Sequence, residues 1–356
     1  MRVLTVLGAR PQFIKAAPVS RVLRQHHQEF LVHTGQHYDD AMSDLFFRQL
    51  ALPAPDVNLG VGSGSHGVQT GAMLAGIESV AAEQRPDWML VYGDTNSTLA
   101  GALVAAKLHI PVAHVEAGLR SYDRRMPEEV NRVVADHLST LLLCPTDTSV
   151  ANLLREGISL GVQMVGDVML DAYRQNLGVA RGSISILKDL GLAAQSYQLL
   201  TVHRAENVDE PSALAAILKG VGDSGLSTVF PVHPRTRAAL QSGTAQVGPN
   251  VVLIDPVGYL EMLVLEENAE VVVTDSGGVQ KEAYFAGRPC ITLRDTTEWT
   301  ETVSAGWNVL VGTDPKKISD SMRGFRPEGH RPDLFGDGAA AERVVQALAS
   351  LIVPNP

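Results

Sequence analysis

Cysteine is nearly absent from this 356-residue chain, and long apolar runs are missing altogether. The two thiols, Cys144 and Cys290, build neither a disulfide framework nor a four-thiolate zinc site. No apolar run approaches the length of a membrane-spanning helix, and the run at residues 3–7 is too short for the core of a signal peptide. We therefore expect a cytoplasmic protein without a membrane partner.

Positive charge is also scarce, with 29 Lys and Arg against 39 Asp and Glu and a net charge of −10. This balance argues against nucleic acid as the main partner, although a local pocket for a nucleotide can still be basic. Apolar residues make up 45% of the chain and charged residues 19%, which excludes a disordered or fibrous protein. At roughly 150 residues per domain, the length predicts about two domains.

Short apolar runs alternate with longer helical patterns along the whole chain. Runs without strict polar alternation are typical of strands in a parallel sheet that is covered on both faces. We predict strands at residues 2–7, 29–34, 88–92, 112–115, 141–144, 162–165, 198–202, 228–232, 251–254, 271–273 and 290–293. Polar residues follow these runs, at the strand ends where open α/β sheets bind ligands.

The two halves of the chain resemble each other in pattern. WMLVYGDTNSTLAGALVAAKLHIPVAHVEAG and VVVTDSGGVQKEAYFAGRPCITLRDT both give a strand, a polar turn, a small-residue helix, a proline and a second strand. This pattern predicts an α/β protein of two Rossmann-like domains that face a central cleft. We place the first domain at residues 1–170 and the second at 171–356, with a final helix near 340–352.

Two loops suit an anion such as phosphate. GARPQFIK (8–15) is neither a dinucleotide fingerprint nor a P-loop, but it places Arg10 and Lys15 where a helix begins. In TDSGGVQKE, Ser276, Gly277 and Gly278 open a helix whose amides would approach a ligand closely. One turn further on, Glu282 could hold a ribose diol. The alternatives are a solvated loop for the first segment and a capped helix for the second.

Histidines at strand ends are the next candidates. His203 follows the strand at 198–202, which favours contact with a ligand, and His233 follows the next strand with both interpretations open. His109 and His114 bracket a strand and receive no role.

Three carboxylates lie on loops or helix starts in the first half: Asp94, Glu116 and Glu128. Such a set can transfer protons at carbon if some of the pKa values are raised. They are too scattered for a typical Mg²⁺ site, and the HxxxH spacing of His33 and His37 spans a strand end instead of a helix. Each carboxylate alone could also be a helix cap. We expect no bound metal.

Together these segments resemble the non-hydrolysing UDP-N-acetylglucosamine 2-epimerases. The matching stretches keep their order over nearly the whole chain: GARPQFIK (8–15), HTGQH (33–37), YGDTNST (92–98), HVEAGLRS (114–121), MPEEVNR (126–132), TVHRAEN (201–207), TDSGGVQKEA (274–283) and RDTTE (294–298). The resemblance implies two Rossmann-like domains of the GT-B type, a final helix that packs back on the first domain, and a homodimer.

The resemblance also implies a reaction and a set of roles. UDP would be eliminated across C1–C2 to give 2-acetamidoglucal and then re-added, which converts UDP-GlcNAc to UDP-ManNAc for surface polysaccharide without a cofactor or a catalytic metal. The acid and base groups would be Asp94, Glu116 and Glu128. The groups at the departing UDP would be Arg10, His203, Ser276, Gly277 and Gly278, with Glu282 on the ribose and Lys15 nearby.

Several positions depart from the family's common pattern. Trp299 stands where many members have an arginine, Val257 and Met262 replace a Gln and a Phe of the uracil-side loop, and residues 35–40 read GQHYDD instead of the GQHREM of allosterically activated members. Relatives with such variations act on other UDP-2-acetamido sugars, of the fucosamine type or diacetamido uronates. A glycosyltransferase and a non-catalytic UDP-sugar sensor are further alternatives, and the three carboxylates argue against both.

Overall fold

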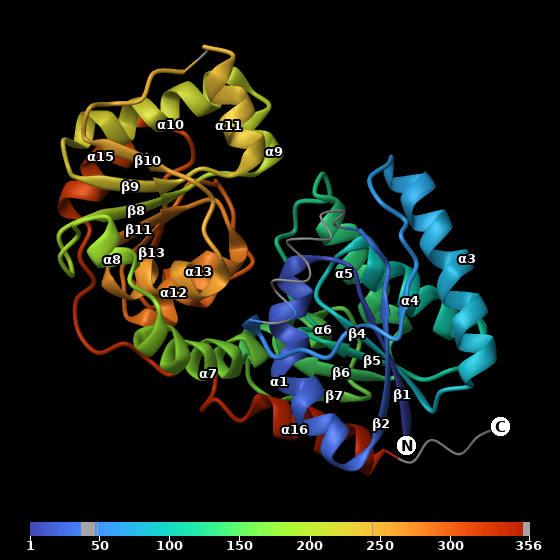
Figure 1. Ribbon diagram of the computed structural model, residues 1–356. Helices are drawn as coiled ribbons and strands as arrows, with labels where there is room; N and C mark the ends of the chain where they lie inside the picture. The colour runs from blue at the N-terminus through green and yellow to red at the C-terminus, as the bar shows by residue number, and fades with distance from the viewer. Residues whose placement is uncertain (37–46, 48, 244, 352–356) are drawn as a thin grey trace. The chain divides into compact units, whose positions relative to one another are not determined.

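The computed structural model describes residues 1–36, 47, 49–243 and 245–351 (Figure 1). These residues form two compact units. Unit 1 comprises the described residues from Met1 to Arg174 and those from Phe335 onward, and unit 2 comprises those from Gln175 to Leu334. The boundary therefore lies inside helix α7 (Val168–Ser183), a little beyond the expected residue 170, and the C-terminal segment belongs to unit 1.

The described part of unit 1 contains a seven-stranded parallel sheet of order β3-β2-β1-β4-β5-β6-β7. Its strands are β1 (Arg2–Leu7), β2 (Gln28–His33), β3 (Val57–Asn58), β4 (Trp88–Tyr92), β5 (Val112–Val115), β6 (Leu141–Cys144) and β7 (Val162–Met164). The central strands β4, β5 and β6 are buried along their whole length and are mostly apolar, as expected where helices cover both faces.

Helices α1 (Arg10–His26) and α16 (Ala340–Ser350) lie side by side on one face of this sheet (Figure 1). On the other face, α4 (Asn96–Lys107) packs between α3 (His66–Gln84) and α5 (Pro127–Leu138). The small residues of α4 permit a close approach, since a Cβ at Gly101 would lie 2.9 Å from Cγ1 of Val91. Helix α6 (Asp147–Arg155) connects β6 to β7.

The C-terminal segment is attached to unit 1 by hydrogen bonds to α7 and to the residue before it. Asp171 accepts a hydrogen bond of 2.8 Å from the amide of Ala341 at the start of α16, and the amide of Asp167 donates to the carbonyl of Phe335 at 3.0 Å. Burial raises the pKa of Asp171 to about 6, against the opposing effect of the Ala341 and Ala340 amides. The helix near the chain end is thus part of the first unit.

Unit 2 repeats the architecture with a sheet of order β10-β9-β8-β11-β12-β13, which is parallel throughout the described residues. Its strands are β8 (Gln198–Thr201), β9 (Thr228–Pro231), β10 (Val251–Ile254), β11 (Val271–Thr274), β12 (Cys290–Thr292) and β13 (Asn308–Leu310). Together the two parallel sheets confirm the α/β fold class expected from the sequence. The edge strands β3 and β13 were not expected.

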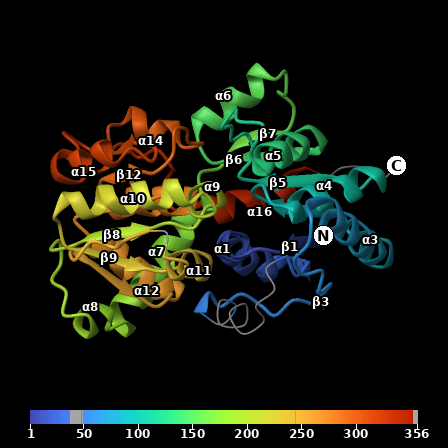
Figure 2. The same cartoon turned by 90° about the horizontal axis from the view of Figure 1, so that it is seen from above.

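The helices of unit 2 also form two layers (Figures 1 and 2). One layer consists of α9 (Ala205–Val208), α10 (Pro211–Ser224), α11 (Pro234–Gln241) and α15 (Pro315–Gly324). The other contains α12 (Tyr259–Asn268), which packs on α8 (Ile186–Asp189) and α13 (Gly277–Ala286). The short helix α14 (Thr300–Ser304) precedes β13. Among the described residues, no helix is both long and apolar enough to cross a bilayer.

Two glycines of the α6–β7 connection test the backbone packing of unit 1. Gly157 and Gly161 both have a positive φ, +80° and +72°. A Cβ at Gly161 would overlap the carbonyl oxygen of Thr140, whereas nothing lies within 4 Å of a Cβ at Gly157. Gly157→Ala should therefore cost only the left-handed strain, about 1–2 kcal/mol. Gly161→Ala should cost roughly a further 1–3 kcal/mol because the clash is with backbone. Urea unfolding of the two variants measures the difference, and equal midpoints would contradict the packing argument.

Candidate active site

A buried ion pair marks the carboxyl end of β5 in unit 1. Glu116 directly follows this strand, and its carboxylate pairs with the ammonium group of Lys15 from the second turn of α1. Both side chains are less than a tenth exposed. The two opposite charges compensate each other in a buried place. The sequence prediction named both residues, and the structure brings them together.

Gly93 leaves the space that this pair occupies. It follows β4 with φ +62°, a conformation that favours glycine, and Glu116 itself has φ +71°. A Cβ at Gly93 would lie 3.0 Å from Nζ of Lys15 and 3.2 Å from Oε2 of Glu116. The tight turn after β4 is therefore shaped around the ion pair.

Asp94, the next residue, forms an ion pair with Arg132 of α5. The guanidinium of Arg132 also binds Glu129 at 2.8 Å. Glu129 accepts further hydrogen bonds from the amides of Ser121 and Tyr122, each at 2.9 Å, and from the hydroxyl of Ser121 at 3.0 Å. Arg132 thus links the candidate carboxylate Asp94 to Glu129, a buried carboxylate that already accepts several hydrogen bonds.

The neighbouring Glu128 differs from Glu129. Glu128 is partly exposed in the first turn of α5 and makes no hydrogen bond or ion pair with the described residues. Asn131 of the same helix donates to the backbone carbonyl of Asp94 at 2.9 Å and to the side chain of Asn96 at 3.2 Å. The sequence prediction chose Glu128 and gave no role to Glu129, Asn131 or Arg132, although the spacing of Glu129 and Arg132 fits a pair on one helix face.

A second buried network lies behind this turn. His114 of β5 contacts the carbonyl oxygen of Gly93 through Nε2 and the carboxylate of Asp136 through Nδ1, each at 2.7 Å. Arg120 binds Asp136 at 2.7 Å and, through two nitrogens, Glu156 at 2.7 Å each. The sequence analysis gave His114 no role.

The start of α1 is closed by one of its own side chains. Oε1 of Gln12 accepts hydrogen bonds from the amides of Gly8 at 2.8 Å and Ala9 at 3.1 Å. Arg10 is the first residue of the helix and is partly exposed. The sequence pattern suggested that amides of this loop could bind an anion, but Gln12 already accepts the hydrogen bonds of Gly8 and Ala9. Arg10 and Lys15 are the cations of this segment.

In unit 2, the TDSGG segment opens helix α13 as predicted. Ser276 is the N-cap, and its hydroxyl accepts a hydrogen bond from the amide of Val279. Gly277 and Gly278 form the first turn. A Cβ at Gly277 would overlap the carboxylate of Glu298, which also binds Arg294 at 3.0 Å. A side chain at position 277 would therefore require the Glu298 carboxylate to move.

His203 is held in place by Asp275, to which the sequence prediction gave no role. The carboxylate of Asp275 is fully buried and accepts hydrogen bonds from the amides of His203 and Arg204 and from the side chain of Asn207, at 3.0–3.2 Å. Nδ1 of His203 lies 3.3 Å from the same carboxylate. Although burial acts in the opposite direction, the hydrogen bonds and charge of His203, with those of the amides and Asn207, hold the pKa of Asp275 below its ordinary value.

Two buried acids lie close together on α12 and α13. Glu282 is 5% exposed and Glu266 is fully buried, and within the described part neither oxygen of Glu266 has a hydrogen-bond partner. Burial, and then the charge of Glu282, raise the pKa of Glu266 well above its ordinary value. Burial thus disfavours the charged form of Glu266 beside the predicted ribose ligand.

The departures from the family's pattern have identifiable surroundings. Trp299 is buried, and Nζ of the buried Lys281 lies 4.1 Å from its ring centroid, a cation–π contact. Val257 and Met262 pack against the apolar core of unit 2. His37 and the rest of the 37–40 segment lie outside the described residues.

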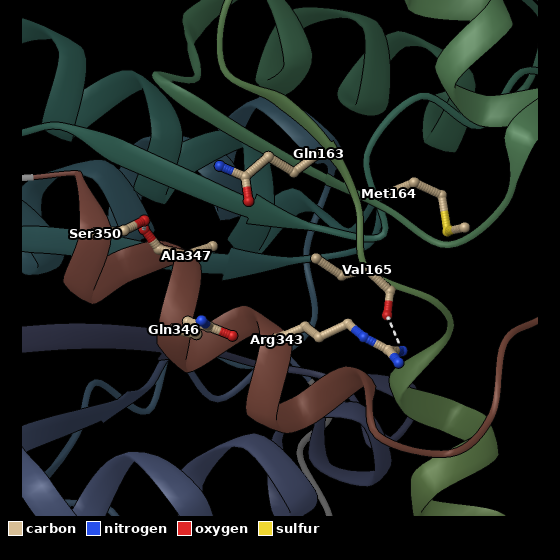
Figure 3. Close-up of a pocket in the computed structure, with 7 residues that line it drawn as sticks. All are labelled: Gln163, Met164, Val165, Arg343, Gln346, Ala347 and Ser350. Carbon is tan, nitrogen blue, oxygen red and sulfur yellow. Dashed lines mark hydrogen bonds between the residues drawn. The ribbon is translucent and has the colours of Figure 1, made fainter.

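The cavity found in unit 1 lies apart from the candidate residues. No cluster of three or more His, Cys, Asp or Glu side chains in the described ranges could hold a metal ion. A cavity of about 240 Å³ in unit 1 lies between β7 and α16 and is lined by Gln163, Met164, Val165, Arg343, Gln346, Ala347 and Ser350 (Figure 3). Arg343 points across it to the carbonyl of Val165. It contains none of the candidate residues.

Comparison with known proteins decides the family. The family model for UDP-N-acetylglucosamine 2-epimerase matches residues 21–349. The chain is 50% identical to a UDP-N-acetylglucosamine 2-epimerase homolog of Methanococcus maripaludis, over 99% of this chain and 100% of that protein. It is 47% identical to the UDP-2,3-diacetamido-2,3-dideoxy-D-glucuronate 2-epimerase of Pseudomonas aeruginosa, again over 99% and 100%. The chain belongs to the UDP-N-acetylglucosamine 2-epimerase family.

A solved structure agrees with this assignment. The Methanocaldococcus jannaschii UDP-GlcNAc 2-epimerase, crystallised with UDP-GlcNAc and UDP, matches with a TM-score of 0.92 at 44% identity, over 98% of this chain and 100% of that one. The family expected from the sequence motifs is confirmed, and so are its epimerase function and its class of isomerase. The roles of the individual residues stay predictions.

The acid response of unit 2 follows from Asp275. Its pKa is lowered in the folded protein, so its stabilising effect is complete above the unfolded pKa of about 3.9 and is lost as the pH falls through the lower folded value. Asp275→Asn should lower the urea midpoint at neutral pH and weaken its decline in acid. Urea titrations from about pH 7 to pH 3 measure this, with Asp333→Asn as the control at an exposed aspartate. Parallel pH profiles for Asp275→Asn and the unmodified protein would contradict the assignment.

Proposed function

We propose that this epimerase interconverts UDP-GlcNAc and UDP-ManNAc by inverting C2 of the sugar. Family membership supports the reaction class. The observation that carries the proposal for this chain is the buried pair of Lys15 and Glu116 beside Asp94, at the adjacent carboxyl ends of β4 and β5. A positioned carboxylate in an enclosed place is what removal of a weakly acidic C–H proton requires.

Glu116 is the proposed base of the elimination. Lys15 favours its ionised form, so the carboxylate is ready to accept a proton in the resting enzyme. Glu116 takes the proton from C2 while the C1–O bond to UDP breaks, which leaves 2-acetamidoglucal and UDP bound. A side chain at position 93 would crowd both members of the ion pair, so the glycine there belongs to the proposed machinery.

The return step needs an acid on the opposite face of the sugar. Asp94 and Glu128 are the candidates that the resemblance names. The acid gives its proton to C2 while an oxygen of UDP adds to C1, so one carboxyl group gains a proton and another loses one in each turnover. Exchange with solvent then restores both groups.

The UDP contacts are proposed from the polar groups of the helix starts. Amides at the N-terminus of α13 suit a phosphate, and His203, held by Asp275, adds a donor to the leaving UDP. Arg10 supplies a further cation. Glu282, beside Glu266 with its raised pKa, is the proposed partner of the ribose hydroxyls.

A second candidate substrate is a UDP-2,3-diacetamido uronate. The Pseudomonas aeruginosa relative that acts on this sugar class is 47% identical over its full length, a value similar to that of the UDP-GlcNAc relatives. Trp299 with Lys281 beside it also differs from the arginine expected in the common family pattern. The chemistry at C2 would be the same for both substrates.

Proton NMR in D₂O distinguishes the candidates. The purified, EDTA-treated protein is incubated with UDP-GlcNAc and, separately, with the UDP-diacetamido uronate. Formation of UDP-ManNAc with deuterium at C2 is the expected result. Turnover of the uronate alone would select the second substrate. Binding of UDP without exchange at C2 on either sugar would reject the epimerase mechanism and favour a transferase or a sensor.

Glu116→Gln removes the proposed base while preserving shape. We expect kcat to fall roughly 10²–10⁴-fold, the usual contribution of a general base, while UDP binds as before. Glu83→Gln makes the same change at an exposed position of α3 and should leave kcat unaltered. Deuterium incorporation gives the rate and calorimetry gives the affinity. An equal loss of UDP affinity would reject the assigned role.

His203→Ala tests the UDP contact. Hydrogen bonds to charged groups contribute about 1.5–3 kcal/mol, so the Kd for UDP should rise by roughly ten- to a hundredfold. His330→Ala, at an exposed histidine of unit 2, serves as the matched control. Titration calorimetry with UDP measures both variants. An affinity for UDP that is unchanged in His203→Ala would exclude this contact.

The assembly proposed for the enzyme is the homodimer that the family resemblance implies. Sedimentation equilibrium of the purified protein tests it directly. A monomer at micromolar concentration would contradict this part of the proposal.

A further inference from the structure

We propose that His114 is a positioning residue of this site, held as an imidazolium that links the Gly93 carbonyl to the Asp136 carboxylate. The inference deepens the proposed function, because the turn it holds carries Asp94, and it rests on that function for its catalytic consequence. The protonation state itself rests only on the hydrogen-bond geometry.

The location of His114 explains why it can act on two candidate groups. It lies in β5, two residues before Glu116, and pairs in register with Val91 of β4. Its side chain is fully buried and reaches the carbonyl of Gly93 in the turn that follows β4. The imidazole therefore lies beneath the turn that presents Asp94.

Both ring nitrogens of His114 face acceptors. Nε2 is 2.7 Å from the carbonyl oxygen of Gly93, which has no proton to donate. Nδ1 is 2.7 Å from Oδ1 of Asp136. The other oxygen, Oδ2, accepts from Arg120 at 2.7 Å and from the amide of Gly118 at 3.1 Å, which is the environment of an ionised carboxylate. A neutral imidazole has one N–H and could satisfy only one of these contacts.

The surrounding charges support the same state. Burial alone would raise the pKa of Asp136, but the hydrogen bonds and charges of His114 and Arg120 hold the pKa below its ordinary value. The hydrogen bonds from Arg120 likewise lower the pKa of Glu156. Burial raises the pKa of the nearby Cys144 thiol to about 12, so it adds no charge. Two cations and two anions thus alternate through this network.

The network contacts the candidate site through His114, which reaches the Gly93 turn. Lys15, Glu116 and Asp94 are the charged groups grouped around the Gly93 turn, and Arg132 neutralises Asp94. The turn is tied to β5 twice, because the amide of Gly93 donates to the carbonyl of Val115 at 3.0 Å and its own carbonyl accepts from His114. Without the imidazole, a buried carbonyl would lose its partner and the turn one of its two attachments.

Nitrogen-15 NMR of the histidine-labelled enzyme tests the protonation state. We expect both ring nitrogens of His114 to show protonated shifts at about pH 8, where an ordinary histidine is neutral. His114→Gln identifies the signal by its loss. A single protonated nitrogen at about pH 8 would overturn the imidazolium assignment, and this readout does not depend on finding the substrate.

Kinetics test the positioning role. Asp136→Asn and His114→Gln should each lower kcat roughly 10²-fold, the effect of a misplaced catalytic group, with little change in KM or UDP affinity. His137→Gln, at an exposed histidine of α5, is the control. A merely structural role would lower the unfolding midpoint with kcat intact, and that result would overturn the proposal. If the unmodified enzyme turns over no UDP-sugar, the proposed function fails, while the NMR result still decides the state of His114.

Discussion

Buried charge must be compensated, and in unit 1 this requirement fixes the geometry of the candidate site. An uncompensated buried charge costs about 3–5 kcal/mol, so each charged side chain here is placed by its partner. Lys15 ties α1 to the end of β5, and Arg132 ties α5 to the end of β4. The strands alone would leave these carboxylates on separate loops. The ion pairs hold these side chains in a defined arrangement at the carboxyl ends of the strands. They also explain why so many ionic groups can lie within an apolar fold.

The sequence predicted the sheets well because parallel strands covered on both faces leave continuous apolar runs. It did not predict β3 and β13, which are edge strands of two and three residues with no such run. Groups that follow strand ends, such as Glu116 and His203, were also predictable. The contacts of His114 with Asp136, 22 residues away, and of His203 with Asp275, 72 residues away, were not predicted. Such pairings depend on which segments the fold brings together, and a single sequence carries no local signal for them.

The two units place carboxylates in contrasting environments. In unit 1, Glu116 is paired with a cation, whereas in unit 2 burial and a neighbouring acid raise the pKa of Glu266. An ionised carboxylate suits proton removal, and a neutral acid beside a carboxylate suits hydrogen bonding to uncharged hydroxyl groups. The same residue type therefore supplies two different chemistries, and the choice is made by what each fold packs against it.

Trp299 gives unit 2 an optical signal of its own. Its indole nitrogen lies 3.6 Å from the place a Cβ would take at Gly277, at the first turn of α13, and the ammonium group of Lys281 lies over its ring. Indole emission responds to nearby charge and to the loss of water. A phosphate arriving at this helix end would therefore change the fluorescence without any attached dye. Replacing Trp88 and Trp307 by phenylalanine would isolate that emission, so that the fluorescence of the enzyme itself would report phosphate binding.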